Sequence, residues 1–478
     1  MQFYHLHVHS CFSFGEGAST PEELVEVAKE LKMSYLALTD KDGLYGAVRF
    51  YRKAQKEGIQ PIIGAELLTE KGFPLVLLAK NNKGYSNLSQ LITASHLGSS
   101  NGVFARFDVL ERFSQDLFAL SGGPGGELSW CLKMGKETVA EKLARRYIRI
   151  FGRENFIIEL QDHLLPEECS VNDKLFELAC KLHLLVVATN NVYYANKSQH
   201  ELHQVLARAA RIVHHRSITE KPNPEYYLKS YCRMASVFTK YPFALFNTHL
   251  LASECNVELP LGKIQAPCFL NKNNEHFHLT KSCFQNLPQK YHPPSKKATQ
   301  RLIKELRIIE EKGFSSYFLL VQDIVNFARK KGIRCQARGS ASGSIVAYLS
   351  GISQIDPIEH DLLFERFLNP ERVDFPDIDL DFDSRKRDDV MDYVFNKYGN
   401  DKVALVATVP TFRARGAIRE AGRALGLEYA SIDKLIQFLP YLPANRITDA
   451  LNSLPELRQS KIRDFQELVA ISCEMNGL

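Results

Sequence analysis

The sequence lacks several features that would place it in a specialised class of protein. Its ten cysteines are scattered and include no CxxC pair, which argues against a zinc-finger or disulfide framework and favours reduced thiols. No apolar run approaches the ~18 residues of a membrane span. The N-terminus, MQFYHLHVHS, lacks the basic and apolar regions of a secretory signal. We therefore expect a cytoplasmic protein with no membrane partner.

Charge of one sign is not in strong excess either. The formal net charge of +5 is compatible with a polyanionic partner, but only clustering of the basic residues would argue for one. The hydrophobic fraction of 45% is that of a soluble globular protein. The length of 478 residues predicts about two to four domains.

A run of alternating carboxylates is the most informative feature that is present. From Pro376 to Asp383, aspartates alternate with Ile, Leu and Phe. In an extended strand alternate side chains share a face, so one face would carry Asp377, Asp379 and Asp381. Hard divalent ions such as Mg²⁺ favour carboxylates together with substrate phosphates, so the run predicts a metal site for phosphoryl or nucleotidyl transfer. A solvated strand face or a Ca²⁺ loop explains this segment alone equally well.

A loop of small residues precedes that run by about forty positions. It extends from Arg338 to Ser344 and leads into an apolar run that can continue as a helix. Glycines let backbone N–H groups approach an anion, a helix N-terminus adds its positive dipole end, and Arg338 adds a guanidinium suited to phosphate. The loop therefore indicates a phosphate site, and the alternative is an ordinary Ser/Gly turn that caps a buried helix. The loop and the aspartate run together are much more specific than either alone.

The N-terminal region alternates predicted strands and helices. We expect a strand over 3–9, a helix that begins at Pro21, a strand over 35–40, a helix over 47–55 and a strand over 59–68. Thr20 is the expected N-cap of the first helix. The alternation argues for a parallel α/β architecture, whose active residues lie at the carboxyl ends of strands. The polar residues at or near such ends are His7, His9, Asp40 and Glu66.

Three short motifs in this region resemble those of the PHP (polymerase and histidinol phosphatase) superfamily, a metal-dependent phosphoesterase barrel. They are His7-Val8-His9-Ser10, Leu38-Thr39-Asp40 and Gly64-Ala65-Glu66. The resemblance implies a PHP-type barrel over residues 1–255.

The chain departs from the metal-ligand pattern of that family. Lys41 stands where the family has His, while Asn191 and Tyr193 stand where it has Asp and His. The usual Asp after the first motif is Glu16, and a common Cys position is Gly123. An ammonium, an amide and a phenol cannot replace the family's ligands around a polynuclear cluster, so we expect an inactive site without bound Zn²⁺ or Mn²⁺. The remains of that site would be His7, His9, Glu16, Asp40 and Glu66.

The run from Gly313 to Asp383 resembles, nearly segment for segment, the palm of the C-family DNA polymerases, the family of the bacterial DNA polymerase III alpha subunit. The resemblance implies that Asp377 and Asp379 are catalytic carboxylates that hold two Mg²⁺ ions, with Asp381 in support. It also implies primer-template DNA and dNTPs as partners. The residues that would contact the triphosphate are Arg338, Gly339, Ser340 and Arg366.

Two departures point to one branch of that family. The loop reads Cys335-Gln336-Ala337-Arg338-Gly339-Ser340 where the family usually has Gly-Pro-Gly-Arg-Gly-Ser. A Gly43-Leu44-Tyr45-Gly46 stretch lies in the PHP region. Both features look more like the error-prone, damage-tolerant branch than the main replicase.

Basic residues recur on two predicted helices. A helix over Thr411–Leu425 carries arginines at every fourth position: Arg415, Arg419 and Arg423. In a polymerase thumb this stripe would bind duplex DNA phosphates, and a solvated helix face is the alternative. The same two interpretations apply to a basic helix that includes Arg301.

The resemblance covers essentially the whole chain and implies four regions: a PHP domain over 1–255, a connector over 256–297, a palm over 298–408 and a thumb over 409–478. The predicted fold class is therefore α/β multidomain, with a (βα) barrel, a palm and the start of a helical thumb. The third catalytic aspartate and the fingers of the family lie further along, and nothing after Asp383 is an evident substitute. We expect the N-terminal portion of a polymerase, with little or no synthesis by itself.

Two other functions remain open at this point. One is a metal-dependent phosphoesterase or 3′–5′ exonuclease that works through the PHP site. The other is a non-catalytic PHP scaffold that binds a separate proofreading exonuclease and other replisome proteins.

Overall fold

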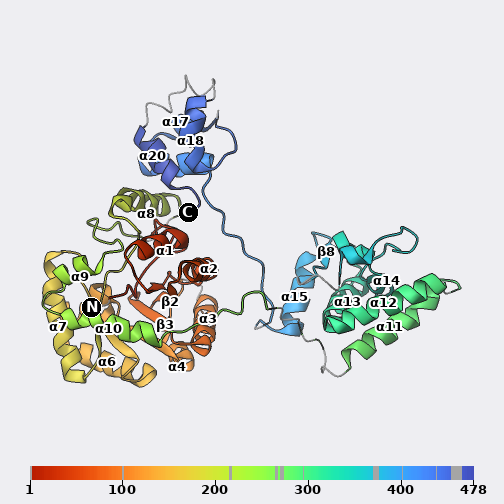
Figure 1. Cartoon of the computed structure of the whole chain (residues 1–478), viewed down its shortest axis with the longest axis horizontal. Helices are drawn as coiled ribbons and strands as arrows, with labels where there is room; N and C mark the ends of the chain where they lie inside the picture. The colour runs from red at the N-terminus through yellow and green to blue at the C-terminus, as the bar shows by residue number, and fades with distance from the viewer. Residues whose placement is uncertain are drawn as a thin grey trace. The chain divides into compact units, whose positions relative to one another are not determined.

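The chain divides into two compact units, which consist of residues Met1–Leu259 with Val409–Leu478 and of residues Pro260–Thr408. Its structure is a computed structural model, drawn in Figure 1. The residues that the structure describes are 3–98, 102–214, 218–263, 267, 269, 274–293, 295–369, 376–400, 402–437, 439–453 and 466–478.

The sheet of the first unit has six strands in the order β1-β2-β3-β4-β5-β6. They span Tyr35–Leu38, Gln60–Leu68, Pro74–Ala79, Leu117–Leu120, Phe156–Gln161 and Val186–Thr189. Neighbouring strands are parallel except β3, which is antiparallel to both β2 and β4. The predicted parallel arrangement is wrong at β3 because a tight turn, in which Gly72 adopts φ +80°, reverses the chain directly after β2.

The N-terminal segment closes this sheet into a barrel. On one side its carbonyls accept hydrogen bonds from the backbone of β1 and of the residue that follows it. On the other side His9 N–H donates to Val192 O at 2.8 Å, and Val192 N–H donates to His7 O at 3.0 Å. The strand predicted over 3–9 is reduced to a single bridge, between Val8 and Val192, because the segment divides its hydrogen bonds between two neighbours.

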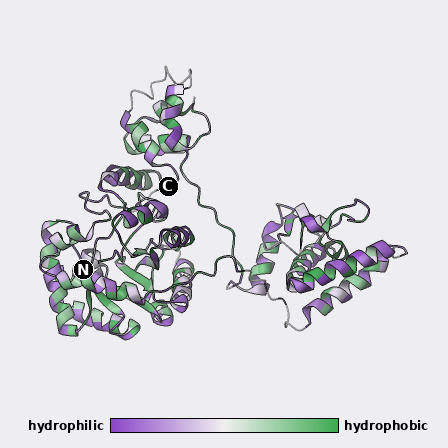
Figure 2. Cartoon of the chain, in the orientation of Figure 1, coloured by the Kyte–Doolittle hydropathy of each residue, from purple (hydrophilic) through white to green (hydrophobic). Residues whose placement is uncertain are grey.

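Helices surround the strands of the first unit (Figure 1). They are α1 Pro21–Glu30, α2 Ala47–Glu57, α3 Asn82–Leu97, α4 Phe107–Phe113, α5 Glu127–Lys133, α6 Glu137–Phe151, α7 Pro166–Leu182, α8 His200–His214, α9 Tyr231–Val237 and α10 Pro242–Glu254, with 3₁₀ turns at Gly123–Gly125 and Lys197–Gln199. The predicted cap of α1 is confirmed, since Thr20 and Glu23 form a capping box. Hydrophobic and hydrophilic residues alternate along the helices, as Figure 2 shows.

The C-terminal residues of the chain belong to the first unit. Their helices are α16 Ala414–Ala424, α17 Tyr429–Gln437, α18 Ile447–Ser453 and α20 Gln466–Glu474, with a 3₁₀ turn at Ala444–Arg446. Helix α16 packs against α8, and their shared core includes Leu202, Val205, Leu206, Ala417, Ile418 and Ala421. The helix predicted over Thr411–Leu425 is thus confirmed with shorter ends.

The second unit is mainly helical. Its elements are α11 Glu275–Lys290, α12 Lys296–Glu311, α13 Ser315–Lys330, β7 Cys335–Arg338, η3 Gly339–Gly343, α14 Ile345–Leu349, η4 Phe364–Arg366, β8 Asp379–Phe382 and α15 Arg387–Tyr398. Helix α11 lies inside the stretch predicted as a connector, so that prediction is wrong for 275–290. Apolar residues at every fourth position, Leu279, Cys283 and Leu287, bury one face of α11 in the core of the unit.

The strands β7 and β8 form a two-stranded antiparallel sheet. Arg338 pairs with Asp379 in this ladder, and Cys335 pairs with Phe382. The strand predicted for the aspartate run is confirmed over β8, while Asp377 lies just before it. The small-residue loop and the aspartate run therefore meet at one end of the sheet. Across the described helices of both units, none has the length and apolar character needed to cross a membrane.

Candidate active site

The aspartate run exposes its carboxylates and turns its apolar side chains inward, as predicted. The exposed residues are Asp377, Asp379 and Asp381. The half-buried residues that pack against the core of the unit are Ile378, Leu380 and Phe382. Among the described residues neither Asp377 nor Asp379 forms an ion pair, whereas Asp381 Oδ2 lies 3.6 Å from Arg338 Nε. Two adjacent, uncompensated carboxylates are a donor set that fits a hard divalent cation.

The small-residue loop begins where β7 ends, next to these carboxylates. Arg338, Gly339 and Ser340 are exposed. Gly339 adopts φ +71°, a conformation that other residues rarely accept. A Cβ at this position would lie 3.8 Å from Asp379 Oδ2, so the loop backbone and the carboxylate are direct neighbours.

The helix after the loop does not offer its N-terminus to a ligand. The buried carboxylate of Glu305 accepts hydrogen bonds from the Ser344 hydroxyl at 2.8 Å and from the Val346 N–H at 3.3 Å. Ser344 also caps α14 by accepting from the Ala347 N–H at 3.1 Å. The carboxylate of Glu305 thus already occupies the helix N-terminus that was predicted to bind phosphate. The prediction that this helix N-terminus binds phosphate is wrong. The open part of the loop is Arg338 to Ser340.

The side chain of Arg301 binds the end of the small-residue loop. It does not lie on a solvated or DNA-binding helix face. Its Nη2 donates to Gly343 O and to Leu362 O, each at 2.6 Å, and its Nε donates to Glu305 Oε1 at 3.0 Å. These bonds join the end of the loop to the segment that leads to Arg366, which is exposed in η4. The i,i+4 spacing of Arg301 and Glu305 is visible in the sequence, but their burial is not.

The residues predicted to be the remains of a PHP site lie in a buried, charge-paired network in the first unit. His7 Nδ1 lies 2.8 Å from Glu159 Oε1, and His7 Nε2 lies 3.0 Å from Glu66 Oε2. His9 Nε2 lies 3.1 Å from His7 Nε2 and from Asn191 Oδ1. Burial opposes the charged form of His7, but the Glu159 and Glu66 carboxylates raise its pKa to about 9. His7 is therefore an imidazolium between two carboxylates. One of them, Glu159, is not among the site residues predicted from the sequence.

Lys41 adds a second fixed positive charge to this network. Its Nζ lies 2.6 Å from Glu16 Oε1 and 3.6 Å from Glu66 Oε1. Burial disfavours the ammonium, but Tyr193 and these two carboxylates hold the pKa of Lys41 well above its usual range. Ligand atoms of His7, His9 and Glu66 do lie within 4.8 Å of one another. With an ammonium bound to the neighbouring carboxylates, however, the residues do not fit a polynuclear metal cluster.

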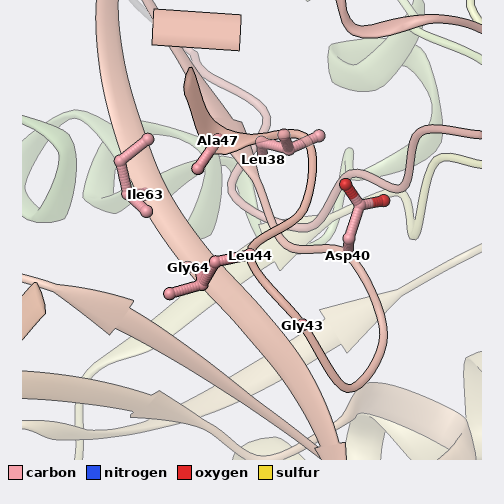
Figure 3. Close-up of a pocket in the computed structure, with 7 residues that line it drawn as sticks. All are labelled: Leu38, Asp40, Gly43, Leu44, Ala47, Ile63 and Gly64. Atoms are coloured by element: carbon pink, nitrogen blue, oxygen red, sulfur yellow. The ribbon is translucent and has the colours of Figure 1, made fainter. Parts of the chain in front are cut away.

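Asp40 holds the first loop of the barrel. Its Oδ1 accepts hydrogen bonds from the Ser10 N–H at 2.6 Å and from the Ser13 hydroxyl at 2.7 Å, and its Oδ2 accepts from the Ser10 hydroxyl at 2.7 Å. Burial raises the pKa of Asp40 to about 6. Figure 3 shows Asp40 beside a hollow whose other lining residues, such as Leu38 and Ile63, are apolar or glycine. Among these lining residues, Asp40 therefore has the one side chain that could coordinate a metal ion.

The other positions that depart from the PHP pattern are filled by packing. The Tyr193 ring stacks on His9 with centroids 4.4 Å apart, and Lys221 Nζ lies 3.9 Å from the centre of the Tyr193 ring. Gly123 adopts φ +57°, and a Cβ there would lie 2.5 Å from the Gln161 side chain. An aromatic ring and an ammonium thus occupy space beside His9.

The three arginines predicted to contact DNA lie on α16, and two of them are engaged within the protein. Arg415 Nε donates to a backbone carbonyl after α17 at 2.6 Å. Arg423 Nη1 lies 3.5 Å from Glu420 Oε1, and its guanidinium lies 4.8 Å from the centre of the Tyr429 ring. Arg419 is half-buried on the same helix. Contact between this stripe and DNA stays a prediction.

Two stretches of the chain match known protein families. Residues 277–478 match the bacterial DNA polymerase III alpha NTPase domain, and residues 5–163 match the PHP domain. The chain is 42% identical, over 98% of its length, to the error-prone DNA polymerase of Symbiobacterium thermophilum, of which it covers 45%. It is 35% identical over 99% of its length to the DNA polymerase III subunit alpha of Treponema pallidum, of which it covers 42%. It is 38% identical over 90% of its length to the error-prone DNA polymerase of Cutibacterium acnes, of which it covers 39%.

The chain thus spans less than half the length of these relatives. Nearly all of the chain is nevertheless aligned with each of them, and both the barrel and the aspartate unit have their counterparts. Over nearly its whole length the chain is similar to bacterial DNA polymerase III alpha subunits and error-prone DNA polymerases.

Proposed function

We propose that the chain carries active-site residues of a DNA-directed DNA polymerase, which adds dNTPs to a primer 3′ end in DNA replication or error-prone repair synthesis. The observation that carries this proposal is the β7–β8 register, in which Arg338 lies opposite Asp379. This register brings carboxylates for divalent cations and donors for a triphosphate together at one end of a sheet.

Each residue at this end has a role that its surroundings permit. Asp377 and Asp379 would hold the cations, because they are exposed and have no ion-pair partner among the described residues. Bound Mg²⁺ supplies activation of the primer 3′-hydroxyl and neutralises charge on the triphosphate. Arg338 would bind phosphate oxygens by exchanging its weak contact with Asp381 for them. Gly339 lets the loop backbone approach the phosphates closely.

We infer that the chain comes from the error-prone branch of the family. Identity is 42% and 38% to the two error-prone polymerases but 35% to the alpha subunit from Treponema pallidum. The loop sequence Cys335-Gln336-Ala337, which replaces Gly-Pro-Gly, supports the same inference.

We further propose that the PHP barrel is a non-catalytic scaffold to which a proofreading exonuclease can bind. The Lys41 ammonium beside Glu16 and Glu66 supports this role over that of a phosphoesterase. Zn²⁺ and Mn²⁺ content after dialysis against each metal tests the choice. We expect the network around His7, His9 and Glu66 to bind less than one ion per chain. One ion per chain that is lost in His9→Ala would instead favour the phosphoesterase.

Primer extension on a primed template with Mg²⁺ tests the polymerase function. In a polymerase that contains this chain, Asp377→Asn/Asp379→Asn should slow incorporation by about 10³-fold. The matched control is Asp381→Asn, which removes a charge from the same face but should retain most of the activity. Incorporation at an undiminished rate in the double variant would contradict the proposed site.

A further inference from the structure

Tyr317 contacts the aspartate run from a neighbouring helix. It lies in the first turn of α13, and its half-buried ring packs against the core of the second unit. Its hydroxyl accepts a hydrogen bond from the Ile378 N–H at 3.0 Å. Because Ile378 lies between Asp377 and Asp379, this contact is made at the centre of the candidate metal site.

The backbone at the two aspartates is held in different ways. Asp379 is the first residue of β8 and pairs with Arg338 in the ladder. Asp377 and Ile378 precede the strand, so the ladder does not fix them. Ile378 is held instead by its side chain, which packs against the core, and by its N–H, which donates to Tyr317. The position of Asp377 relative to Asp379 therefore depends on this hydrogen bond.

The two carboxylates also act on the tyrosine through space. Burial raises the pKa of Tyr317, and the negative charges of Asp377 and Asp379 raise it further. A neutral hydroxyl at this position presents no charge that competes with a bound cation, and its oxygen remains an acceptor for the N–H.

We propose that Tyr317 is a positioning residue for the palm carboxylates: by holding the Ile378 N–H, it sets the spacing at which Asp377 and Asp379 bind divalent cations. This inference rests on the proposed function, because it concerns the same site. Removal of a partner that orients metal ligands lowers metal affinity by about 10- to 100-fold. Tyr317→Phe deletes only the hydroxyl and should weaken divalent-cation binding by about tenfold.

Mn²⁺ binding to the 478-residue chain, followed by electron paramagnetic resonance, measures this effect without a catalytic step. The binding that disappears in Asp377→Asn/Asp379→Asn defines the palm site, and Tyr317→Phe should shift that binding to about tenfold higher Mn²⁺. The matched control is Tyr393→Phe, whose hydroxyl donates to Asp323 at 2.7 Å in the same unit. The control should leave Mn²⁺ affinity unchanged even where its thermal stability falls. In a polymerase that contains this chain, the Mg²⁺ concentration for half-maximal synthesis should rise in Tyr317→Phe and not in Tyr393→Phe.

Each other outcome has a distinct meaning. Unchanged Mn²⁺ affinity in Tyr317→Phe, with binding still lost in the aspartate variant, would overturn the positioning role and leave the proposed function intact. Equal weakening in both tyrosine variants would also overturn it, since a general loosening of the unit would be the cause. Mn²⁺ binding that survives in the aspartate variant would contradict the proposed metal site itself. If Tyr317→Phe does not fold, 4-fluorophenylalanine at position 317 replaces the hydroxyl by a poor acceptor that does not ionise and should shift binding in the same direction.

Discussion

The two carboxylate-rich regions of the chain differ in how their negative charge is balanced. In the barrel, Glu66 and Glu159 are buried and lie against the imidazole of His7, while Glu16 is paired with Lys41. In the second unit, Asp377 and Asp379 are exposed and have no ion-pair partner among the described residues. The first network carries its own cations, whereas the second leaves room for cations from solution.

Residue types alone therefore do not define a metal site. Both regions contain residue types that sequence motifs associate with metals, which are His, Asp and Glu in the barrel and Asp in the second unit. A buried carboxylate must be paired, and a protein cation that satisfies it removes the need for a metal. An exposed pair of like charges is instead stabilised when a divalent ion binds between them.

Neutralising Asp377 and Asp379 should have the largest effect on activity and little effect on stability. In a polymerase that contains this chain, Asp377→Asn/Asp379→Asn should slow synthesis by about 10³-fold, because metal-assisted charge stabilisation contributes several kcal/mol to the transition state. The free energy of unfolding should not fall, since both side chains are exposed and form no ion pair within the part of the chain that the structure describes. Single-turnover extension and urea denaturation measure the two quantities. A large loss of stability would mean that these carboxylates are structural.

Removing the lysine from the barrel network should have the reverse effect. Lys41→Met leaves Glu16 and Glu66 without their ammonium and should lower the free energy of unfolding by about 3 kcal/mol, at the low end for a buried pair because the ammonium is partly exposed. The matched control is Lys29→Met, which breaks an exposed pair with Glu57 and should cost less than about 1 kcal/mol. Urea denaturation of the chain compares them. Equal losses in the two variants would show that the barrel network is not specially stabilising.

The buried barrel should also respond to acid. Burial lowers the pKa of His5 to about 4, well below the value near 6.5 of an unfolded histidine. Between these pH values the unfolded chain binds more protons, so the stability that His5 contributes is lost as the pH falls. From pH 7.5 to 5, His5→Gln should therefore lose about 1–2 kcal/mol less stability than the unchanged chain. Parallel curves of unfolding free energy against pH would refute this assignment.

The smallest expected effect concerns DNA binding by α16. Arg419 forms no ion pair among the described residues, whereas Arg423 contacts Glu420. Arg419→Ala should reduce the slope of log affinity against log salt for duplex DNA by about one, and Arg423→Ala should reduce it by less. Fluorescence anisotropy over a range of salt concentrations measures both slopes. No change in either variant would leave the stripe as an ordinary helix face.

Local patterns in the sequence predicted the features that depend on few residues. The alternation of β8 and the Thr20 cap of α1 follow from side-chain periodicity and capping chemistry, and the structure confirms both. The antiparallel direction of β3 was missed, because a short turn decides it and no periodicity reveals it. Helix α11 was missed because its polar flanks suggested a connector.

The side-chain contacts within the two sites could not be predicted from the sequence. Glu159 meets His7 across the barrel, although 152 positions separate them along the chain. The Arg301 and Glu305 pair has a visible spacing, but its burial under the loop depends on how α12 and α14 pack. Such contacts depend on tertiary structure, which a single sequence does not display.

Divalent cations should bind at the exposed carboxylates of the second unit and not in the barrel. Anomalous diffraction from crystals of the chain soaked in Mn²⁺ locates these ions. We expect a peak at Asp377 and Asp379 and none among His7, His9 and Glu66. A strong peak in the barrel, with none at the two aspartates, would refute this assignment of the metal site.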